Sequence, residues 1–156
     1  MSNSNHYVTR KPMTADQVLE MASEIIASKY KRGETLVTAE AAKKFLQSKL
    51  GHYDREVFAI LLLDNQHRLI EYQELFFGTI DSASVYPREV VKAALQHNAA
   101  AVMFAHNHPS GDPQPSMADQ NITDKLTEAL KMIDIRVLDH IVVGKECVSF
   151  AELGLL

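Results

Sequence analysis

The sequence of 156 residues has one cysteine, Cys147, and no tryptophan. A single cysteine excludes an internal disulfide and any zinc site that needs several thiolates, including the paired-cysteine site of nucleobase deaminases. A metal bound by this chain must therefore be held by histidine and carboxylate side chains.

Long hydrophobic runs are lacking as well. Apolar stretches such as 59–63 and 99–105 are far shorter than the roughly 20 residues of a membrane-spanning helix. No basic start followed by an apolar stretch marks a signal peptide. We therefore expect a cytoplasmic protein.

The chain also has no excess of positive charge. Its 16 Lys and Arg residues are scattered and are outnumbered by 20 Asp and Glu residues, which gives a formal net charge of −4. Nothing in this distribution provides a broad basic surface for a nucleic-acid backbone, although a local patch could form. Nucleic acid is thus an unsupported partner that the charge does not exclude.

The hydrophobic content of 46% suits a single domain. Residues 1–12 are polar and patternless, which is typical of a loose arm. Thr14 with Gln17 has the spacing of a capping box and is followed by apolar residues on one helical face. Thr38 is placed to cap a second helix. We expect residues 1–50 to form an arm and helices that pack on a core made by residues 51–156.

The core region alternates strand and helix patterns. A continuous apolar run at 57–63, a turn at Asp64 and a second run at 69–77 predict a hairpin with a buried first strand. Pro87 is suited to begin a helix that leads into an apolar strand at 99–105, and Ser116 to begin another, through about Met132. Segments 137–143 and 148–150 predict two closing strands around a turn at 144–145. This order predicts an α/β (α+β) fold, with a mixed β-sheet flanked by helices.

A short stretch after the apolar strand contains a candidate metal site. His106 and His108, separated by one residue, project from the same side of an extended chain. Asp119 falls in the first turn of the next helix, and three prolines restrict the loop between them. Three protein ligands leave a fourth tetrahedral position for water, whose pKa a bound zinc ion lowers to about 7. The expected cofactor is one Zn²⁺ per chain.

Each part of this pattern also has a structural explanation. Ser116 and Asp119 have the spacing of a helix N-cap and its N3 carboxylate, so a helix start would account for both. A lone His-x-His recurs by chance and is compatible with ordinary loop histidines. Only the combination favours a metal site.

The pattern His-x-His, seven residues, Ser, two residues, Asp resembles the JAMM metalloprotease motif of MPN domains. Residues 55–58 (REVF), 87–90 (PREV), 106–112 (HNHPSGD) and 139–144 (DHIVVG) resemble the RadC-like branch of that family. The resemblance runs from about Gly51 to the C-terminus. It implies an MPN/JAB-like, cytidine-deaminase-like architecture for residues 51–156.

The resemblance also implies roles for individual residues. His106, His108 and Asp119 would bind zinc, and Ser116 would help to stabilise the tetrahedral intermediate. The family needs a glutamate ahead of the motif, next to an early strand, and Glu56 resembles that residue.

Glu56 would then accept a proton from the metal-bound water and return it to the leaving amine. The sequence alone does not separate Glu56 from Glu71 or Glu74, and a solvated charge beside Arg55 is its structural alternative. Glu89 is explained by its place in a first helical turn.

Two further residues are candidates for contacts with the metal ligands. A ligating imidazole usually gives its second N–H to an oxygen or carbonyl, and Asp112 or His140 could serve a ligand in this way. A turn aspartate and a strand-end histidine are equally good explanations.

The leading hypothesis is therefore a JAMM-type zinc-dependent hydrolase that acts on an unknown peptide or protein substrate. The alternatives are a non-catalytic MPN scaffold in which the metal only joins loop and helix, and a DNA-associated protein of the RadC type. A metal-dependent nuclease is disfavoured because one His-His-Asp set offers no second metal site. A non-haem iron oxygenase also uses two His and one carboxylate, but with different spacing.

Overall fold

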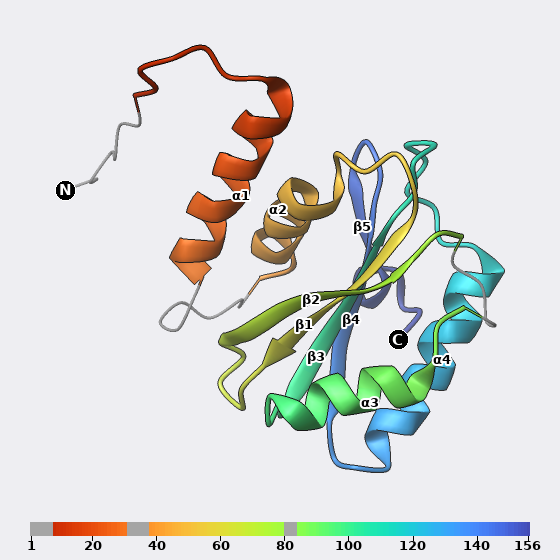
Figure 1. The fold of residues 1–156 in the computed structure, drawn as a ribbon. Helices are drawn as coiled ribbons and strands as arrows, with labels where there is room; N and C mark the ends of the chain where they lie inside the picture. The colour runs from red at the N-terminus through yellow and green to blue at the C-terminus, as the bar shows by residue number, and fades with distance from the viewer. Residues whose placement is uncertain (1–7, 31–37, 80–83) are drawn as a thin grey trace.

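A five-stranded mixed β-sheet forms the centre of the computed structural model, which describes residues 8–30, 38–79 and 84–156 (Figure 1). The strand order is β2-β1-β3-β4-β5. Strands β3 and β4 are parallel, and the other neighbours are antiparallel. The strands are β1 (Val57–Leu63), β2 (Leu69–Phe77), β3 (Ala101–Asn107), β4 (Arg136–Val143) and β5 (Cys147–Ser149).

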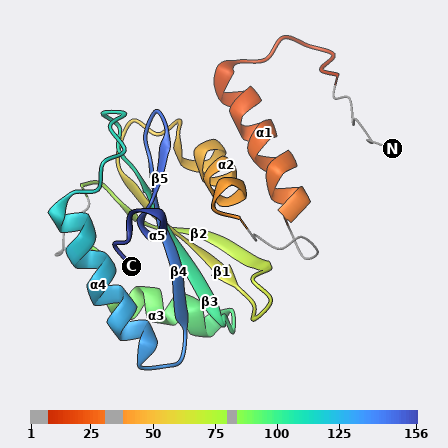
Figure 2. The same ribbon diagram turned by 180° about the vertical axis from the view of Figure 1, so that it is seen from behind.

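Helices cover both faces of the sheet, as the two opposite views show (Figures 1 and 2). On one face α2 (Ala39–Leu50) packs on the strands, and α1 (Ala15–Tyr30) lies against α2. On the other face lie α3 (Pro87–Gln96) and α4 (Met117–Lys131). A single-turn helix, α5 (Phe150–Leu153), follows β5. The predicted fold class, a mixed sheet flanked by helices, is confirmed.

The apolar run of β1 is continuous because both of its faces are buried. Val57, Ala59, Leu61 and Leu63 belong to the core cluster under α2, and Phe58, Ile60 and Leu62 belong to the cluster under α3 and α4. Side chains alternate between faces with a period of two, so a strand between two helical layers needs apolar residues at every position. In β3 the same alternation places Phe104 and His106 on the α4 face and Asn107 on the α2 face.

The predicted helix starts are confirmed by their hydrogen bonds. The Thr14 N–H donates to Gln17 Oε1 at 3.0 Å, and the Gln17 N–H donates to Thr14 Oγ1 at 3.3 Å. Thr38 Oγ1 accepts the N–H of Ala41 at 3.2 Å, and Pro87 is the first residue of α3. Of the predicted arm at 1–12, residues 1–7 lie outside the described part of the chain.

The predicted bounds of two strands are wrong. The strand expected at 99–105 is β3 at Ala101–Asn107, so His106 lies within the strand and not after it. The expected last strand at 148–150 ends at Ser149, and Phe150 begins α5. Ser149 Oγ accepts the Glu152 N–H at 3.1 Å, and Asp139 Oδ1 accepts the Ala151 N–H at 3.0 Å. These bonds satisfy the first amides of a helical turn, whereas the strand pattern of the sequence shows only the apolar spacing.

The division of the chain at residue 50 stays a prediction. Phe45 and Leu46 of α2 are fully buried in the same cluster as the odd-numbered residues of β1.

Among the described residues, no helix is long and apolar enough to cross a membrane.

Candidate metal centre

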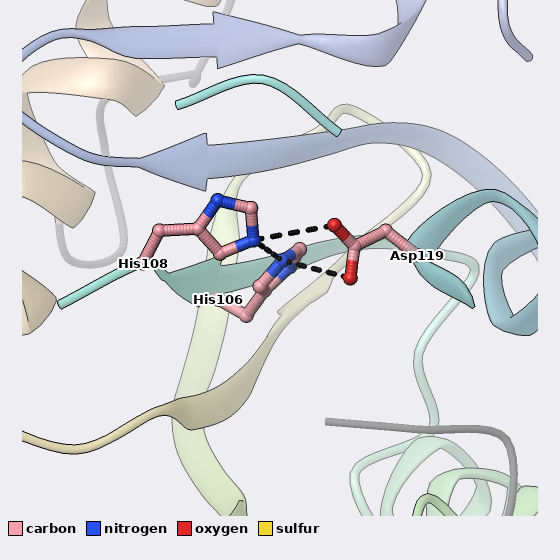
Figure 3. A group of neighbouring side chains, drawn as sticks. All are labelled: His106, His108 and Asp119. Atoms are coloured by element: carbon pink, nitrogen blue, oxygen red, sulfur yellow. Dashed lines mark hydrogen bonds and ion pairs between the residues drawn. The ribbon is translucent and has the colours of Figure 1, made fainter. Parts of the chain in front are cut away.

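The C-terminal end of β3 and the N-terminus of α4 bring His106, His108 and Asp119 together (Figure 3). The two Nε2 atoms lie 3.0 Å apart. Asp119 Oδ1 is 3.2 Å from His106 Nε2, and Oδ2 is 3.2 Å from His108 Nε2. His106 and Asp119 are buried and His108 is half-buried, so the group is open to solvent on the His108 side.

The cap of α4 orients the Asp119 carboxylate. Its Oδ2 accepts the Ser116 N–H at 2.8 Å, and Ser116 Oγ accepts the Asp119 N–H at 3.0 Å. This is the capping box that the sequence offered as a structural alternative to a metal site. The two explanations are compatible, because the same carboxylate caps the helix and faces the imidazoles.

The loop after β3 determines which nitrogen of His108 carries a hydrogen. His108 Nδ1 lies 2.8 Å from the backbone oxygen of Asp112, and a carbonyl can only accept. Nδ1 therefore donates, and the Nε2 of a neutral ring presents a lone pair. Gly111, with a φ of 86°, permits the tight turn in which its N–H donates to the His108 carbonyl at 2.9 Å. Asp112 thus contacts the candidate ligand through its main chain.

A buried chain of hydrogen bonds determines which nitrogen of His106 carries a hydrogen. Thr123 Oγ1 donates to the Asp119 carbonyl at 2.7 Å and therefore accepts from His140 Nδ1, which lies 2.5 Å away. Complete burial lowers the pKa of His140 far below its usual value, so its ring is neutral and its Nε2 carries a lone pair. His106 Nδ1, 2.8 Å from that atom, must donate to it. The His106 Nε2 is then a bare lone pair as well.

Three electron-rich atoms consequently meet with no hydrogen between them. Such a group is stable only around a cation. In the metal-free protein a proton on His108 takes the place of this cation, because a hydrogen bond to Asp119 raises the pKa of His108. Burial raises the pKa of Asp119, but its contacts with the His106 and His108 rings, of which His108 carries the proton, and with the Ser116 N–H outweigh burial and hold that pKa well below its usual range.

The geometry also fits a divalent ion. Bonds of about 2.0–2.1 Å in a tetrahedral zinc site place neighbouring ligand atoms about 3.3 Å apart. The two Nε2 atoms lie 3.0 Å apart, each lies 3.2 Å from a different oxygen of Asp119, and one ligand atom from each of the three residues lies within 4.8 Å of the others. Two imidazoles and one carboxylate are a donor set typical of zinc and related transition metals, so the residues fit the group.

Glu56 lies on the same side of the sheet as the two histidines. In the antiparallel pairing of β1 and β3, the last pair is Phe58 and His106. Glu56 lies two residues before Phe58 and His108 two residues after His106, so a continuation of this register would place them opposite each other. The charge of Glu56 contributes to the raised pKa of His108. The carboxylate is therefore close to the candidate site.

The other two candidate glutamates lie elsewhere. Glu71 is opposite Leu62, near the far end of β1. Glu74 accepts hydrogen bonds from the hydroxyls of Tyr53 at 2.8 Å and Tyr72 at 3.0 Å. The strand register thus distinguishes Glu56 from Glu71 and Glu74, which the sequence alone did not.

Comparison with known proteins decides the family. Residues 36–155 match the model of the RadC-like JAB domain. The chain belongs to this family. A UPF0758 protein of Vibrio cholerae serotype O1 is 58% identical over 153 residues, which are 98% of both chains. A second UPF0758 protein of the same organism is 59% identical over 152 residues, 97% of this chain and 96% of the relative.

Other members of the RadC-like JAB family are longer. A UPF0758 protein of Aeromonas hydrophila is 58% identical over 140 residues, which are 89% of this chain and 62% of the relative. The family match supports the predicted MPN/JAB-like architecture and includes α2 as well as the sheet. The metal role of the three clustered residues and the roles of Glu56 and Ser116 stay predictions.

Two residues near the site were not singled out from the sequence. Thr123, one helical turn after Asp119, connects His140 with the Asp119 carbonyl. Asn107, between the two histidines, bonds to the segment that carries Glu56. Helical spacing from Asp119 could have indicated Thr123. The strand period indicates only that Asn107 faces away from the histidines.

Proposed function

We propose that this RadC-like JAB protein is a hydrolase of peptide or isopeptide bonds that uses one zinc ion. The observation that carries the proposal is the convergence of two imidazole lone pairs and one carboxylate, with the charge of a second carboxylate, Glu56, acting on His108. His106, His108 and Asp119 would hold the ion. When bound, it would supply a Lewis acid and lower the pKa of a coordinated water.

The side chains around the ion have separate tasks in this proposal. Glu56 accepts the proton of the attacking water and returns it to the leaving amine. Ser116 Oγ already accepts the Asp119 N–H, so its O–H is oriented by the helix cap and can donate to the oxygen of the tetrahedral intermediate. His140 and the Asp112 carbonyl keep both ligating rings in the required tautomer.

A polar cleft next to His108 offers room for a substrate. It has a volume of about 340 Å³ and is formed by the loop after β3, the β4–β5 turn and the end of α2. Lys145 and Gly144 from the turn face Gly111 and Ser110 from the loop. His108 lines this cleft, but His106, Glu56, Ser116 and Asp119 do not, so a substrate chain in the cleft would approach the candidate centre at His108.

The first experiment is metal analysis of untagged protein, together with a screen of peptide and isopeptide substrates. We expect one zinc per chain in the wild type and in Glu56→Gln, and none in His108→Ala. Hydrolysis should be lost in both variants, and Glu71→Gln, which removes an exposed carboxylate of β2, serves as the matched control. Activity that survives Glu56→Gln would remove Glu56 from the mechanism, and wild type without stoichiometric metal would overturn the proposal.

A second candidate is a scaffold in which the metal is purely structural. It is favoured by one observation: Asp119 belongs to the cap of α4 and His106 to β3, so a bound ion would join these elements. Zinc that stabilises the fold, combined with no hydrolysis of any substrate in the wild type, would support the scaffold instead.

A further inference from the structure

A buried amide holds the backbone on both sides of Glu56. Asn107 is 2% exposed. Its Oδ1 accepts the Val57 N–H at 2.7 Å, and its Nδ2 donates to the backbone oxygens of Arg55 at 2.8 Å and Tyr53 at 3.4 Å. The residues directly before and after Glu56 are therefore both bonded to one side chain.

The strand register explains why this amide is needed. The ladder between β1 and β3 runs from the pair Leu63 and Ala101 to the pair Phe58 and His106. In the same register, Val57 would be opposite Asn107. There the Asn107 side chain accepts the Val57 N–H and replaces the backbone partner at the end of the ladder. The bonds of Asn107 thus continue the pairing of the two strands as far as Glu56.

Alternation along the strand separates Asn107 from the metal ligands. His106 and His108 project toward α4, and Asn107 projects toward the opposite face of the sheet. Its amide makes one accepted and two donated bonds within the protein. Asn107 can therefore influence the site through the backbone of residues 53–57, without ligating the ion.

We propose that Asn107 is a positioning residue, which sets the Glu56 carboxylate beside the two imidazoles by clamping the Arg55 carbonyl and the Val57 N–H. This inference rests on the proposed function. A displacement of about 1 Å of a reacting group can reduce a rate by about 10²-fold. Asn107→Ala should therefore retain the metal but lose most of the activity that depends on Glu56.

Three variants separate positioning from general destabilisation. Asn107→Ala removes all three bonds of the amide. Asn107→Asp keeps an acceptor for the Val57 N–H but removes the donors to Arg55 and Tyr53. Ser23→Ala is the control, because it removes the bond from a buried hydroxyl to the Ser48 carbonyl at the contact of α1 with α2.

The primary readout is the visible spectrum of the cobalt-loaded protein, because a carboxylate that accepts a hydrogen bond from a cobalt-bound water would change the donor strength of that water whether or not a substrate is known. We expect Asn107→Ala to bind one cobalt per chain and to shift the spectrum as Glu56→Gln does. The double variant should match Glu56→Gln alone, and Asn107→Asp should lie between wild type and Asn107→Ala. Ser23→Ala should leave the spectrum unchanged.

Other results would overturn the inference. A wild-type spectrum in Asn107→Ala, or a shift that adds to that of Glu56→Gln, would show that Asn107 does not act through Glu56. If the wild type binds no cobalt, the proposed function fails, and amide hydrogen exchange at Val57 tests the clamp by itself. Exchange about tenfold faster in Asn107→Ala would support it, and unchanged exchange would refute it.

Discussion

Zinc should stabilise the folded protein by an amount that can be calculated. An ion that binds only the native state adds about 2.7 kcal/mol to the free energy of unfolding when its free concentration is 100 times its Kd. In a domain of this size, 1 kcal/mol shifts the melting temperature by about 2–4 °C. Saturating one site in chelator-treated protein should therefore raise the melting temperature by about 5–11 °C.

Asp119→Asn should abolish this shift while preserving the fold. The amide keeps an oxygen for the Ser116 N–H, which lies 2.8 Å from Asp119 Oδ2. Its NH₂ group can take the place of Oδ1, 3.2 Å from His106 Nε2, and donate to that lone pair. The helix cap therefore survives, but the ion loses its only anionic ligand.

Scanning calorimetry of metal-free protein with and without zinc measures the effect. Asp64→Asn is the matched control, because Asp64 also accepts backbone N–H bonds, in the turn between β1 and β2, and lies outside the candidate site. An equal zinc shift in Asp119→Asn, or no shift in the wild type, would refute the assignment of the site.

Three further predictions concern the pH dependence of zinc affinity, the hydrogen bond of Thr123 and the packing of Phe104. Zinc affinity, measured by competition with a chelator, should rise with pH throughout the range in which His108 is protonated. A proton bound by His108 competes with the ion, and the hydrogen bond to Asp119 raises the pKa of that ring, so the affinity should level off only above the raised pKa; a constant affinity would contradict this. Thr123→Val should weaken zinc binding by about 10–100-fold, because it removes the acceptor for His140 Nδ1, and Thr123→Ser should retain it; equal affinities would show that the chain of bonds has no effect. Phe104→Ala, at a fully buried position, should lower the free energy of unfolding by about 3–5 kcal/mol in denaturant titrations, and a loss below 1 kcal/mol would contradict the packing.

Much of the fold could be predicted because its signals are local. The continuous apolar run of β1 and the capping pairs at Thr14 and Ser116 depend on neighbours within a few residues, so the sequence shows them directly. The end of β5 was predicted wrongly because it depends on a residue that is distant in the sequence. Phe150 begins a helix because Asp139, on another strand, accepts the N–H of the residue after it.

Some residues of the candidate site could likewise be predicted from local spacing, and one could not. His106 and His108 face one side because they are two residues apart on an extended chain, and Asp119 follows at a helix start. The choice of Glu56 among three glutamates depended on a resemblance when only the sequence was considered. The register of β1 against β3 supplies a physical basis, since Glu56 lies two residues before the pair Phe58 and His106, whereas Glu71 lies near the far end of β1.

By itself, the sequence determined the element types apart from α5, the spacing of the candidate metal ligands and the exclusion of a thiolate site, because each follows from residue type and short-range periodicity. Only the tertiary structure decided which atoms face one another in the candidate site. His140 orients His106 from 34 residues away, and Asn107 bonds to Val57 across 50 residues. Contacts over such separations depend on strand order and register, which local patterns do not encode.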